Sequence, residues 1–374
     1  MIDLNKIIEK SIEYHETQKL DSEEILKDLA ANPKKPLLNF IANYHKFLFP
    51  SLKNINFESS TNQEELNQQK KAVVYISNHV SNFDSLTIGS QLFLNNYPYP
   101  IFAAGENLFT NKVSNYLLKS CGAFKLKRKI TTRDKEYMNL IGAYLRANLE
   151  EQIPLMIFPE GTRSRDGKIG EFKRGIISLT LDSYFKNTNL EDILFVPLGI
   201  AYSKVPEDKY FLKNNSSKAQ KKNLIKDFWK MRKNPNPIYL RMGKPISTKE
   251  FFDEYTPTNE KLINSISKDF ASYLRLKTTT IIPILTEDII NHSITEMQEK
   301  EIHLEDLKEN VKNTTDKLRE DFSKNMITNW NSLEETISEL SNRGLIKKTK
   351  EKIKILNKDV IKYYANKITE FYKK

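Results

Sequence analysis

The sequence is nearly free of cysteine and has no long apolar run. One cysteine, Cys121, occurs among 374 residues, which excludes an internal disulfide and a cysteine-based zinc site and suits a reducing compartment. The longest apolar stretches, such as residues 195–202, are far shorter than the roughly 20 residues that a membrane-spanning helix needs. No signal-peptide pattern opens the chain, because Lys6, Glu9 and Lys10 interrupt the first apolar positions. We therefore expect a cytoplasmic protein that is soluble or peripherally attached to a membrane.

The formal charge of +11 is concentrated in the middle of the chain. Residues 71–250 contain 29 lysines and arginines against 16 aspartates and glutamates, whereas the two flanking segments are close to neutral. A focused basic region attracts phosphate groups, whether they belong to a small substrate, a nucleotide-bearing cofactor, nucleic acid or an anionic membrane. Charge alone does not choose among these partners.

The same middle segment has the alternating pattern of an α/β fold. Apolar runs that favour strands are separated by helical patterns, which is typical of a sheet covered by helices. The strand-like runs span residues 73–76, 101–104, 155–158, 194–200 and 238–242. We predict that residues 71–250 form an α/β domain with its site at the strand ends, where such folds place functional side chains.

The flanking segments read as mainly helical. Residues 1–70 predict a small helical subdomain that ends in a polar connector over residues 51–70. Residues 251–374 are charged, almost free of strand signals and helical in pattern, and Gly344 is expected to end one of the helices. These boundaries give three predicted units.

Residues 71–85, KAVVYISNHVSNFDS, place a histidine just after a short buried strand and an aspartate five positions later. Five residues on one helix would hold the two side chains about 140° apart, so His79 and Asp84 can meet only if His79 lies in the strand-to-helix turn. A carboxylate fixes the tautomer of an imidazole and stabilises the imidazolium. His79 is therefore a candidate general base that Asp84 orients. The alternative is a structural histidine with satisfied hydrogen bonds.

Residues 158–167, FPEGTRSRDG, follow a second apolar strand and combine a turn glycine with arginines and hydroxyls. Glycine permits a tight turn with exposed backbone N–H groups, and a planar guanidinium matches phosphate oxygens. The loop is a candidate phosphate site in which the glutamate holds the arginines or touches substrate hydroxyls. The candidate residues are Glu160, Gly161, Thr162, Arg163, Ser164 and Arg165.

Two further stretches are less specific. Residues 122–128, GAFKLKR, suit a strand edge that projects Lys125, Lys127 and Arg128 towards one region, and a solvated basic strand is the alternative. Residues 195–202, FVPLGIAY, form an apolar run that contains Pro197. Because proline cannot donate to a strand ladder, this run predicts an edge strand or a bulge, which lines an apolar groove or packs in the core.

Together, the stretches NHVSNFD, GAFKLKR, FPEGTRSR and VPLGIAY resemble the four sequence blocks of the glycerolipid acyltransferase family, whose first block carries the H-x4-D motif. The resemblance spans roughly residues 70–250. It implies a central mixed sheet flanked by helices and transfer of a fatty acyl group from a thioester to a hydroxyl. It implies no cofactor, no metal and no nucleic-acid partner. The second block departs from the family pattern, since Lys125 and Lys127 stand where an apolar residue and an arginine are common.

The resemblance points to two branches of this family. The stretch FPEGTRSRDGKIGEFKRG is most similar to enzymes that acylate 1-acyl-glycerol 3-phosphate. The stretch PIFAAGENL, residues 221–247 and the terminal IKYYANKITEF are similar to the branch that acylates glycerol 3-phosphate and dihydroxyacetone phosphate. Chain length and the added helical segments favour acylation of glycerol 3-phosphate at its sn-1 hydroxyl, with the monoacyl acceptor as the alternative.

The resemblance also implies roles for the site residues. His79 takes the proton of the attacking hydroxyl, and Asp84 orients it. Arg163, assisted by Arg128 and Lys173, holds the acceptor phosphate, while backbone N–H groups near Gly161 are a candidate site for the oxyanion.

The implied donor is acyl-CoA or acyl carrier protein, and the implied location is the inner face of the cell membrane. The basic, amphipathic residues 218–233 are a candidate contact with anionic lipid, or a solvated helix that packs Trp229 inward. Two readings from other classes stay open. One is a module that binds phosphate or nucleic acid, and the other is a membrane-associated structural or regulatory protein on an inactive scaffold.

Overall fold

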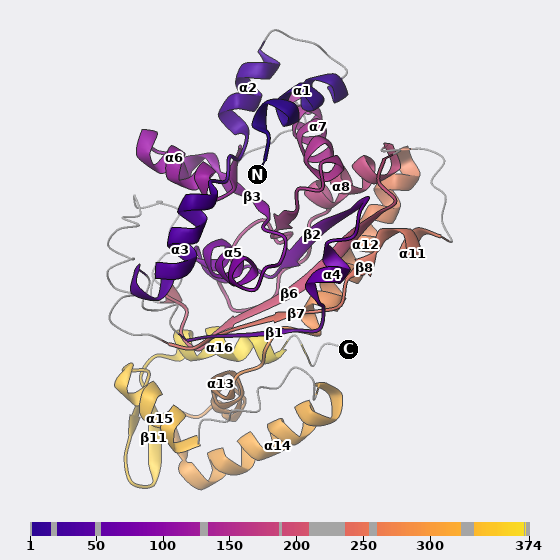
Figure 1. Ribbon diagram of the computed structural model, residues 1–374. Helices are drawn as coiled ribbons and strands as arrows, with labels where there is room; N and C mark the ends of the chain where they lie inside the picture. The colour runs from indigo at the N-terminus through magenta and orange to yellow at the C-terminus, as the bar shows by residue number, and fades with distance from the viewer. Residues whose placement is uncertain are drawn as a thin grey trace.

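The computed structural model describes residues 2–15, 21–48, 54–127, 134–186, 189–208, 236–253, 260–322, 333–369 and 371 (Figure 1). Within these residues the main sheet has eight strands in the order β1-β7-β6-β2-β5-β3-β4, with β8 paired to β6. The strands are β1 (Ile55–Ser59), β2 (Lys71–Ser77), β3 (Ile101–Gly105), β4 (Ala123–Leu126), β5 (Leu155–Ile157), β6 (Asp192–Tyr202), β7 (Ile238–Met242) and β8 (Ile246–Ser247). Parallel and antiparallel pairs both occur, which confirms the predicted α/β fold with a mixed central sheet.

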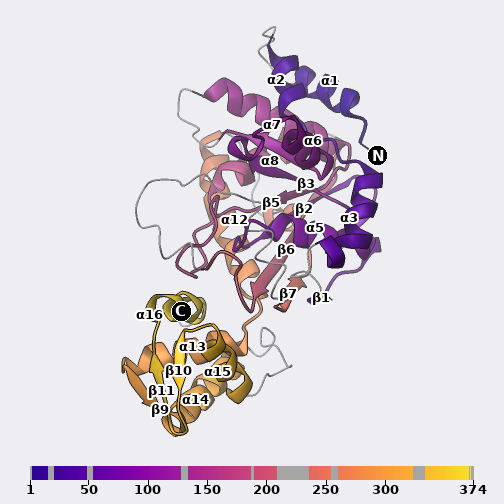
Figure 2. The same ribbon diagram turned by 90° about the vertical axis from the view of Figure 1, so that its left-hand side faces the viewer.

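Helices cover both faces of this sheet (Figures 1 and 2). They are α5 (Asp84–Leu94), α6 (Lys112–Ser120), α7 (Lys135–Glu150), α8 (Arg174–Lys186), α11 (Thr248–Phe252) and α12 (Glu260–Thr279), with the 3-10 helix η2 (Glu106–Leu108) after β3. Alternate side chains of β2 enter two separate cores, because successive residues of a strand point to opposite faces. Val73 and Tyr75 share one core with α5, whereas Val74 and Ile76 share the other with α7, α8 and α12.

The N-terminal segment packs onto this layer. It comprises α1 (Leu4–Tyr14), α2 (Ser22–Leu29), α3 (Lys35–Leu48) and the short α4 (Gln63–Leu66). The predicted polar connector over residues 51–70 is corrected here, because residues 55–59 form β1 at the edge of the main sheet, parallel to β7. Only alternate residues of β1 are partly buried, and Glu58 pairs with Arg241 across the ladder at 2.8 Å. The polar composition that suggested a connector is that of a solvated edge strand.

The C-terminal residues 286–371, which we call the C-terminal unit, lie against the carboxyl end of β6 (Figure 2). The unit contains α13 (Thr286–Met297), β9 (Glu301–His303), α14 (Leu304–Phe322), α15 (Leu333–Asn342), β10 (Ile346–Lys348), β11 (Lys352–Ile355) and α16 (Lys358–Thr369). Its three strands form a small antiparallel sheet, which corrects the expectation of an almost purely helical region. These strands are three or four residues long and mostly lysine and isoleucine, too short for a clear period. Gly344, at φ 70°, follows α15 as expected.

Strand β6 corrects the prediction of an edge strand or a bulge at Pro197, and its burial agrees with the alternative that this run packs in the core. It lies inside the sheet, with β2 on one side and β7 and β8 on the other, and all of its residues are buried. Pro197 falls between the last β7 pair, at Leu198, and the first β8 pair, at Phe195. Its carbonyl accepts from Gly243 N, so its missing N–H faces the gap between β7 and β8, where no strand needs a donor.

None of the helices in the described part of the chain is long and apolar enough to cross a bilayer. Residues 218–233 lie outside the described residues.

Candidate active site

The first and third sequence blocks meet because β2 and β5 are neighbours in the sheet. Ile76 pairs with Ile157, so the chain leaves both parallel strands at the same edge. His79 lies in the turn after β2, and Asp84 is the first residue of α5. His79 Nδ1 lies 2.8 Å from Asp84 Oδ2. The predicted meeting of a turn histidine with a helix aspartate is confirmed.

The Asp84 carboxylate is fully buried and saturated with donors. Its Oδ2 accepts from Val80 N at 2.7 Å and Ser81 N at 3.0 Å in addition to the imidazole. Its Oδ1 accepts from the Tyr202 hydroxyl at 2.7 Å. Burial raises the pKa of Tyr202 well above its ordinary value, so this hydroxyl stays a donor. The helix N-terminus adds a favourable partial charge for the carboxylate.

This arrangement fixes the His79 tautomer. An ionised carboxylate only accepts, so Nδ1 carries the proton and Nε2 presents a lone pair. Within the described part of the chain, Nε2 has no hydrogen-bond partner, and 21% of the side chain is exposed. The ring stacks on Phe158 with centroids 4.4 Å apart. His79 is thus held rigidly with one nitrogen available to a substrate proton.

The buried Glu160 carboxylate binds the backbone of His79. Its Oε1 accepts from His79 N at 2.8 Å, and its Oε2 accepts from Gly170 N at 2.9 Å. Burial raises the pKa of this carboxyl, and the two backbone donors counteract the rise. We predicted that Glu160 holds the arginines or touches substrate hydroxyls, whereas in the structure its two oxygens tie the turn after β2 to the loop after β5.

The loop of residues 160–170 packs closely against that turn. Ser164 N donates to the His79 carbonyl at 2.8 Å, while the Ser164 hydroxyl donates to Lys168 O at 2.7 Å inside the loop. Gly161 has φ +70°, and a Cβ there would lie 3.1 Å from Lys173 Nζ, so the lysine side chain lies over this glycine. Gly161 N already donates to Phe158 O at 2.9 Å, which removes it as an oxyanion donor. Thr162 is exposed.

Arg163 is held by a residue that the sequence analysis missed. Its Nη1 lies 3.2 Å from Oε1 of Glu207, which is 2% exposed. The same Oε1 accepts from Asn82 N at 2.9 Å, and Oε2 accepts from the Ser81 hydroxyl at 2.9 Å. Burial raises the pKa of Glu207, while Asn82 N–H and the Arg163 charge counteract the rise. The only sequence signal was an acidic pair, Glu207-Asp208, shortly after the apolar run of β6.

The second block lies apart from this cluster. Strand β4 is separated from β2 by β5 and β3. Lys125 Nζ pairs with Asp28 at 2.7 Å, and Lys127 Nζ lies 4.5 Å from the centre of the Tyr137 ring. Arg128 lies outside the described residues. The two described lysines therefore have partners within the structure, away from the His79 cluster.

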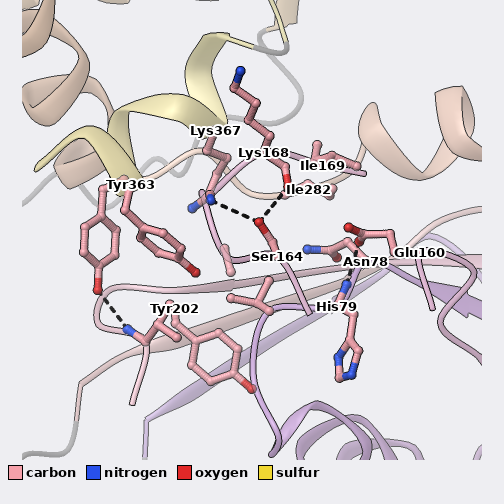
Figure 3. A pocket seen from close by; sticks show the side chains of 15 residues that line it. Asn78, His79, Glu160, Ser164, Lys168, Ile169, Tyr202, Ile282, Tyr363 and Lys367 are labelled. Atoms are coloured by element: carbon pink, nitrogen blue, oxygen red, sulfur yellow. Dashed lines mark hydrogen bonds between the residues drawn. The ribbon is translucent and has the colours of Figure 1, made fainter. Parts of the chain in front are cut away.

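A pocket opens at the carboxyl ends of β2 and β6, and α16 forms one side of it (Figure 3). Asn78 lies at its base, where its amide exchanges two hydrogen bonds with the Ile200 backbone, at 2.9 and 3.0 Å. The lining also includes His79, Ser164, Lys168, Tyr202 and Tyr364. A rigid imidazole base beside a basic loop suits proton abstraction from a hydroxyl on a phosphorylated substrate.

Known proteins that are similar to this chain include acyltransferases. The family model described as Acyltransferase matches residues 56–201. The glycerol-3-phosphate acyltransferase of Pseudomonas fluorescens strain Pf-5 is 31% identical over 193 residues, which are 50% of this chain and 23% of the relative. A protein of the same name from Ectopseudomonas mendocina is 32% identical over 193 residues, with the same coverage. The chain thus spans about a quarter of the length of these relatives.

A solved structure is also similar, the 1-acyl-sn-glycerophosphate (LPA) acyltransferase PlsC from Thermotoga maritima. It has 15% sequence identity and a TM-score of 0.34, over 72% of this chain and 88% of that one.

Proposed function

We propose that the protein, whose residues 56–201 match the Acyltransferase family model, transfers a fatty acyl group from a thioester to the sn-1 hydroxyl of glycerol 3-phosphate. The product would be 1-acyl-glycerol 3-phosphate, a precursor of phospholipids. The observation that carries the proposal is the His79–Asp84 pair, in which a saturated, buried carboxylate leaves one imidazole nitrogen free to accept a proton. The relatives named glycerol-3-phosphate acyltransferase support the choice of acceptor.

In the proposed reaction His79 Nε2 removes the hydroxyl proton as the oxygen attacks the thioester carbonyl. The carbon–sulfur bond then breaks, and the imidazolium returns the proton to the departing thiolate. The products are an ester and a free thiol, so the balance needs no metal, cofactor or covalent acyl-enzyme. The donor is acyl-CoA or acyl carrier protein.

The basic loop would bind the acceptor phosphate. Arg163 lies on the loop of residues 160–170, and the Lys173 side chain lies over Gly161 of this loop. The bond from Ser164 N to the His79 carbonyl links the loop to the base. A phosphate held there would bring its hydroxyl to Nε2 in a fixed geometry, which can contribute several kcal/mol to lowering the barrier. We assign the phosphate contact to Arg163, with Lys173 and Thr162 beside it.

The alternative acceptor is 1-acyl-glycerol 3-phosphate, which the sequence of the third block favours. The two acceptors share a phosphate and differ in the acyl chain and the reacting hydroxyl. The test is thiol release from acyl-CoA by the purified protein, with each acceptor supplied in turn. Turnover with glycerol 3-phosphate supports the proposal, whereas turnover with the monoacyl acceptor alone replaces it by the alternative.

An anionic membrane surface is the proposed partner, because the product must reach a bilayer. The start of α3 adjoins the end of α6, because Lys34 N, just before α3, donates to Ser120 O at 3.0 Å, and neither helix contains Asp or Glu. Each helix carries large apolar side chains that are 45–68% exposed, namely Phe40 and Tyr44 on α3 and Val113, Tyr116 and Leu117 on α6. Exposed apolar residues on acid-free helices that also carry lysines suit insertion at an anionic lipid interface.

Co-sedimentation with vesicles of phosphatidylglycerol and phosphatidylcholine tests this surface. Replacing Val113 and Tyr116 together by Glu should weaken sedimentation at least tenfold. Leu276→Glu is the matched control, since Leu276 on α12 is equally prominent, at 60% exposed, and lies away from α3 and α6. Equal loss in both variants, or none in either, would remove the surface from the proposal.

A further inference from the structure

We propose that the C-terminal unit positions the acceptor-binding arginine, acting through the adjacent carboxylates of Glu207 and Asp208. This inference rests on the proposed function, because it assigns Arg163 to the acceptor phosphate. The unit lies outside the residues that match the acyltransferase model, so nothing in that match explains its presence beside the site. Glu207, Asp208, Arg343 and Tyr364 are positioning residues in this account.

Of the two adjacent carboxylates, Glu207 contacts the segments that carry His79 and Arg163. Its two oxygens bind three groups that belong to the turn after β2 and the loop after β5: Ser81 Oγ, Asn82 N and Arg163 Nη1. A buried carboxylate with these donors fixes the guanidinium relative to the turn that carries His79 and Asp84. Without it, the arginine would choose among many rotamers, and the acceptor would lose its fixed orientation.

Asp208 faces the C-terminal unit. Its Oδ2 accepts from Arg343 Nη2 at 3.1 Å and from the Tyr364 hydroxyl at 2.9 Å. The Tyr364 hydroxyl in turn accepts from Val205 N at 3.0 Å, and the Arg343 guanidinium lies 5.0 Å from the centre of the Tyr364 ring. Arg343 and Asp208 are 7% and 4% exposed at their side chains. The backbone of residues 205–208 is therefore anchored from the C-terminal side at two points.

Helix α16 holds the second site loop as well. Asn366 Nδ2 donates to Asp166 O at 2.7 Å. Gly167 has φ +87°, and a Cβ there would lie 1.7 Å from the Tyr363 carbonyl, so the loop backbone rests directly on the helix. One helix thus contacts both segments that converge on Arg163, the loop of residues 160–170 and the segment after β6. This accounts for Tyr364 and Asn366 of the terminal IKYYANKITEF stretch.

Glu207 and Asp208 are adjacent in the chain, so their Cα atoms are only about 3.8 Å apart. A shift in the anchor of Asp208 must therefore move Glu207 and the arginine that it holds. A displacement of about 1 Å is enough to lose much of the benefit of a positioned substrate. Removing an anchor should consequently weaken acceptor binding more than donor binding.

Tyr364→Phe is the sharpest test, because it removes the hydroxyl that bonds Asp208 and Val205 while keeping the ring over Arg343. We expect the KM for glycerol 3-phosphate to rise about fivefold to tenfold, with the KM for acyl-CoA changed less than twofold. Glu207→Gln should likewise raise the KM for glycerol 3-phosphate more than the KM for acyl-CoA. The double variant should show less than the product of the two single effects, since both act on Arg163. Glu299→Gln, an exposed position of the same unit, is the matched control and should change neither KM.

An unchanged KM for glycerol 3-phosphate in Tyr364→Phe would overturn the inference. An equal rise in both KM values, together with a lower Tm, would also overturn it, because that is the signature of general loosening. Failure of the proposed function looks different: the wild-type protein would then not acylate glycerol 3-phosphate at all. In that case calorimetry with inorganic phosphate replaces the KM, and Tyr364→Phe should still weaken phosphate binding several-fold, while unchanged binding contradicts the inference.

Discussion

The Tyr202 hydroxyl donates a 2.7 Å hydrogen bond to Asp84 from a residue 118 positions further along the chain. Strand β6 pairs with β2 up to Ser77 and Leu198 and continues to Tyr202, so its end lies over the turn that carries His79. The carboxylate that orients the His79 imidazole is therefore itself oriented by the fourth sequence block.

Tyr202→Phe tests this relationship. The variant keeps the buried ring and leaves Asp84 Oδ1 without its donor. Since an unpaired buried acceptor costs about 1–3 kcal/mol, we expect the variant to fold with a lower Tm and kcat to fall about tenfold. Acyl transfer under saturating substrates measures the change. A kcat equal to that of the wild type would show that Tyr202 is not needed to hold Asp84.

Asp84→Asn should be far more severe. An amide presents both a donor and an acceptor to the imidazole, so the His79 tautomer is no longer fixed and the imidazolium loses its counter-charge. We expect kcat to fall by about two to four orders of magnitude, the range typical of lost general-base catalysis. Circular dichroism and Tm check that the variant folds. Activity within tenfold of the wild type would contradict the orienting role.

Arg163→Ala should act on the acceptor instead. Loss of a ground-state phosphate contact raises the KM for glycerol 3-phosphate, by at least tenfold if the guanidinium carries the main contact, and leaves the KM for the donor nearly unchanged. Arg165→Ala is the comparison, since Arg165 is an exposed arginine two residues away, and it should raise the KM for glycerol 3-phosphate less. A larger effect at Arg165 would move the phosphate contact to that residue.

Glu287 predicts a pH dependence of stability. This carboxyl is 4% exposed, and burial raises its pKa to about 8, although Arg343 Nη1 lies 3.9 Å away and counteracts the rise. The folded state therefore keeps a proton that the unfolded state releases near pH 4.3. The contribution of Glu287 to the free energy of unfolding is therefore greatest below that pH, and it is lost as the pH rises towards 8.

Urea unfolding at pH 5 and pH 8 measures this effect. The free energy of unfolding should be lower at pH 8, and Glu287→Gln should reduce the difference by about 1–3 kcal/mol, since each pKa unit is worth about 1.4 kcal/mol at most. Glu299→Gln, an exposed glutamate, is the control. An unchanged difference in Glu287→Gln would mean that Glu287 is ionised in the folded protein throughout.

Local patterns in the sequence were sufficient for most strands of the main sheet and for the meeting of His79 with Asp84. Strand β7 begins and ends at the predicted residues 238 and 242, and His79 meets Asp84 by the predicted turn-to-helix geometry. These features depend on periodicity and short spacing, which a single segment contains.

Long-range partners could not be predicted in this way. Glu207 reaches Ser81 and Asn82 across more than 120 residues, and no periodic pattern records such a contact. The packing of α16 on the site loops depends on how the C-terminal unit docks. The edge position predicted for the strand with Pro197 was wrong for a related reason. Whether the missing N–H of Pro197 breaks a strand ladder depends on the gap between β7 and β8, which the sequence does not reveal.

Thiol release from acyl-CoA in the presence of glycerol 3-phosphate, compared between the wild type and His79→Ala, tests the central claim most directly. His303→Ala is the matched control, since His303 is exposed on β9. We predict turnover by the wild type and by His303→Ala, and a loss of at least a hundredfold in a folded His79→Ala. Retention of more than a tenth of the wild-type rate by His79→Ala would contradict its role as the base.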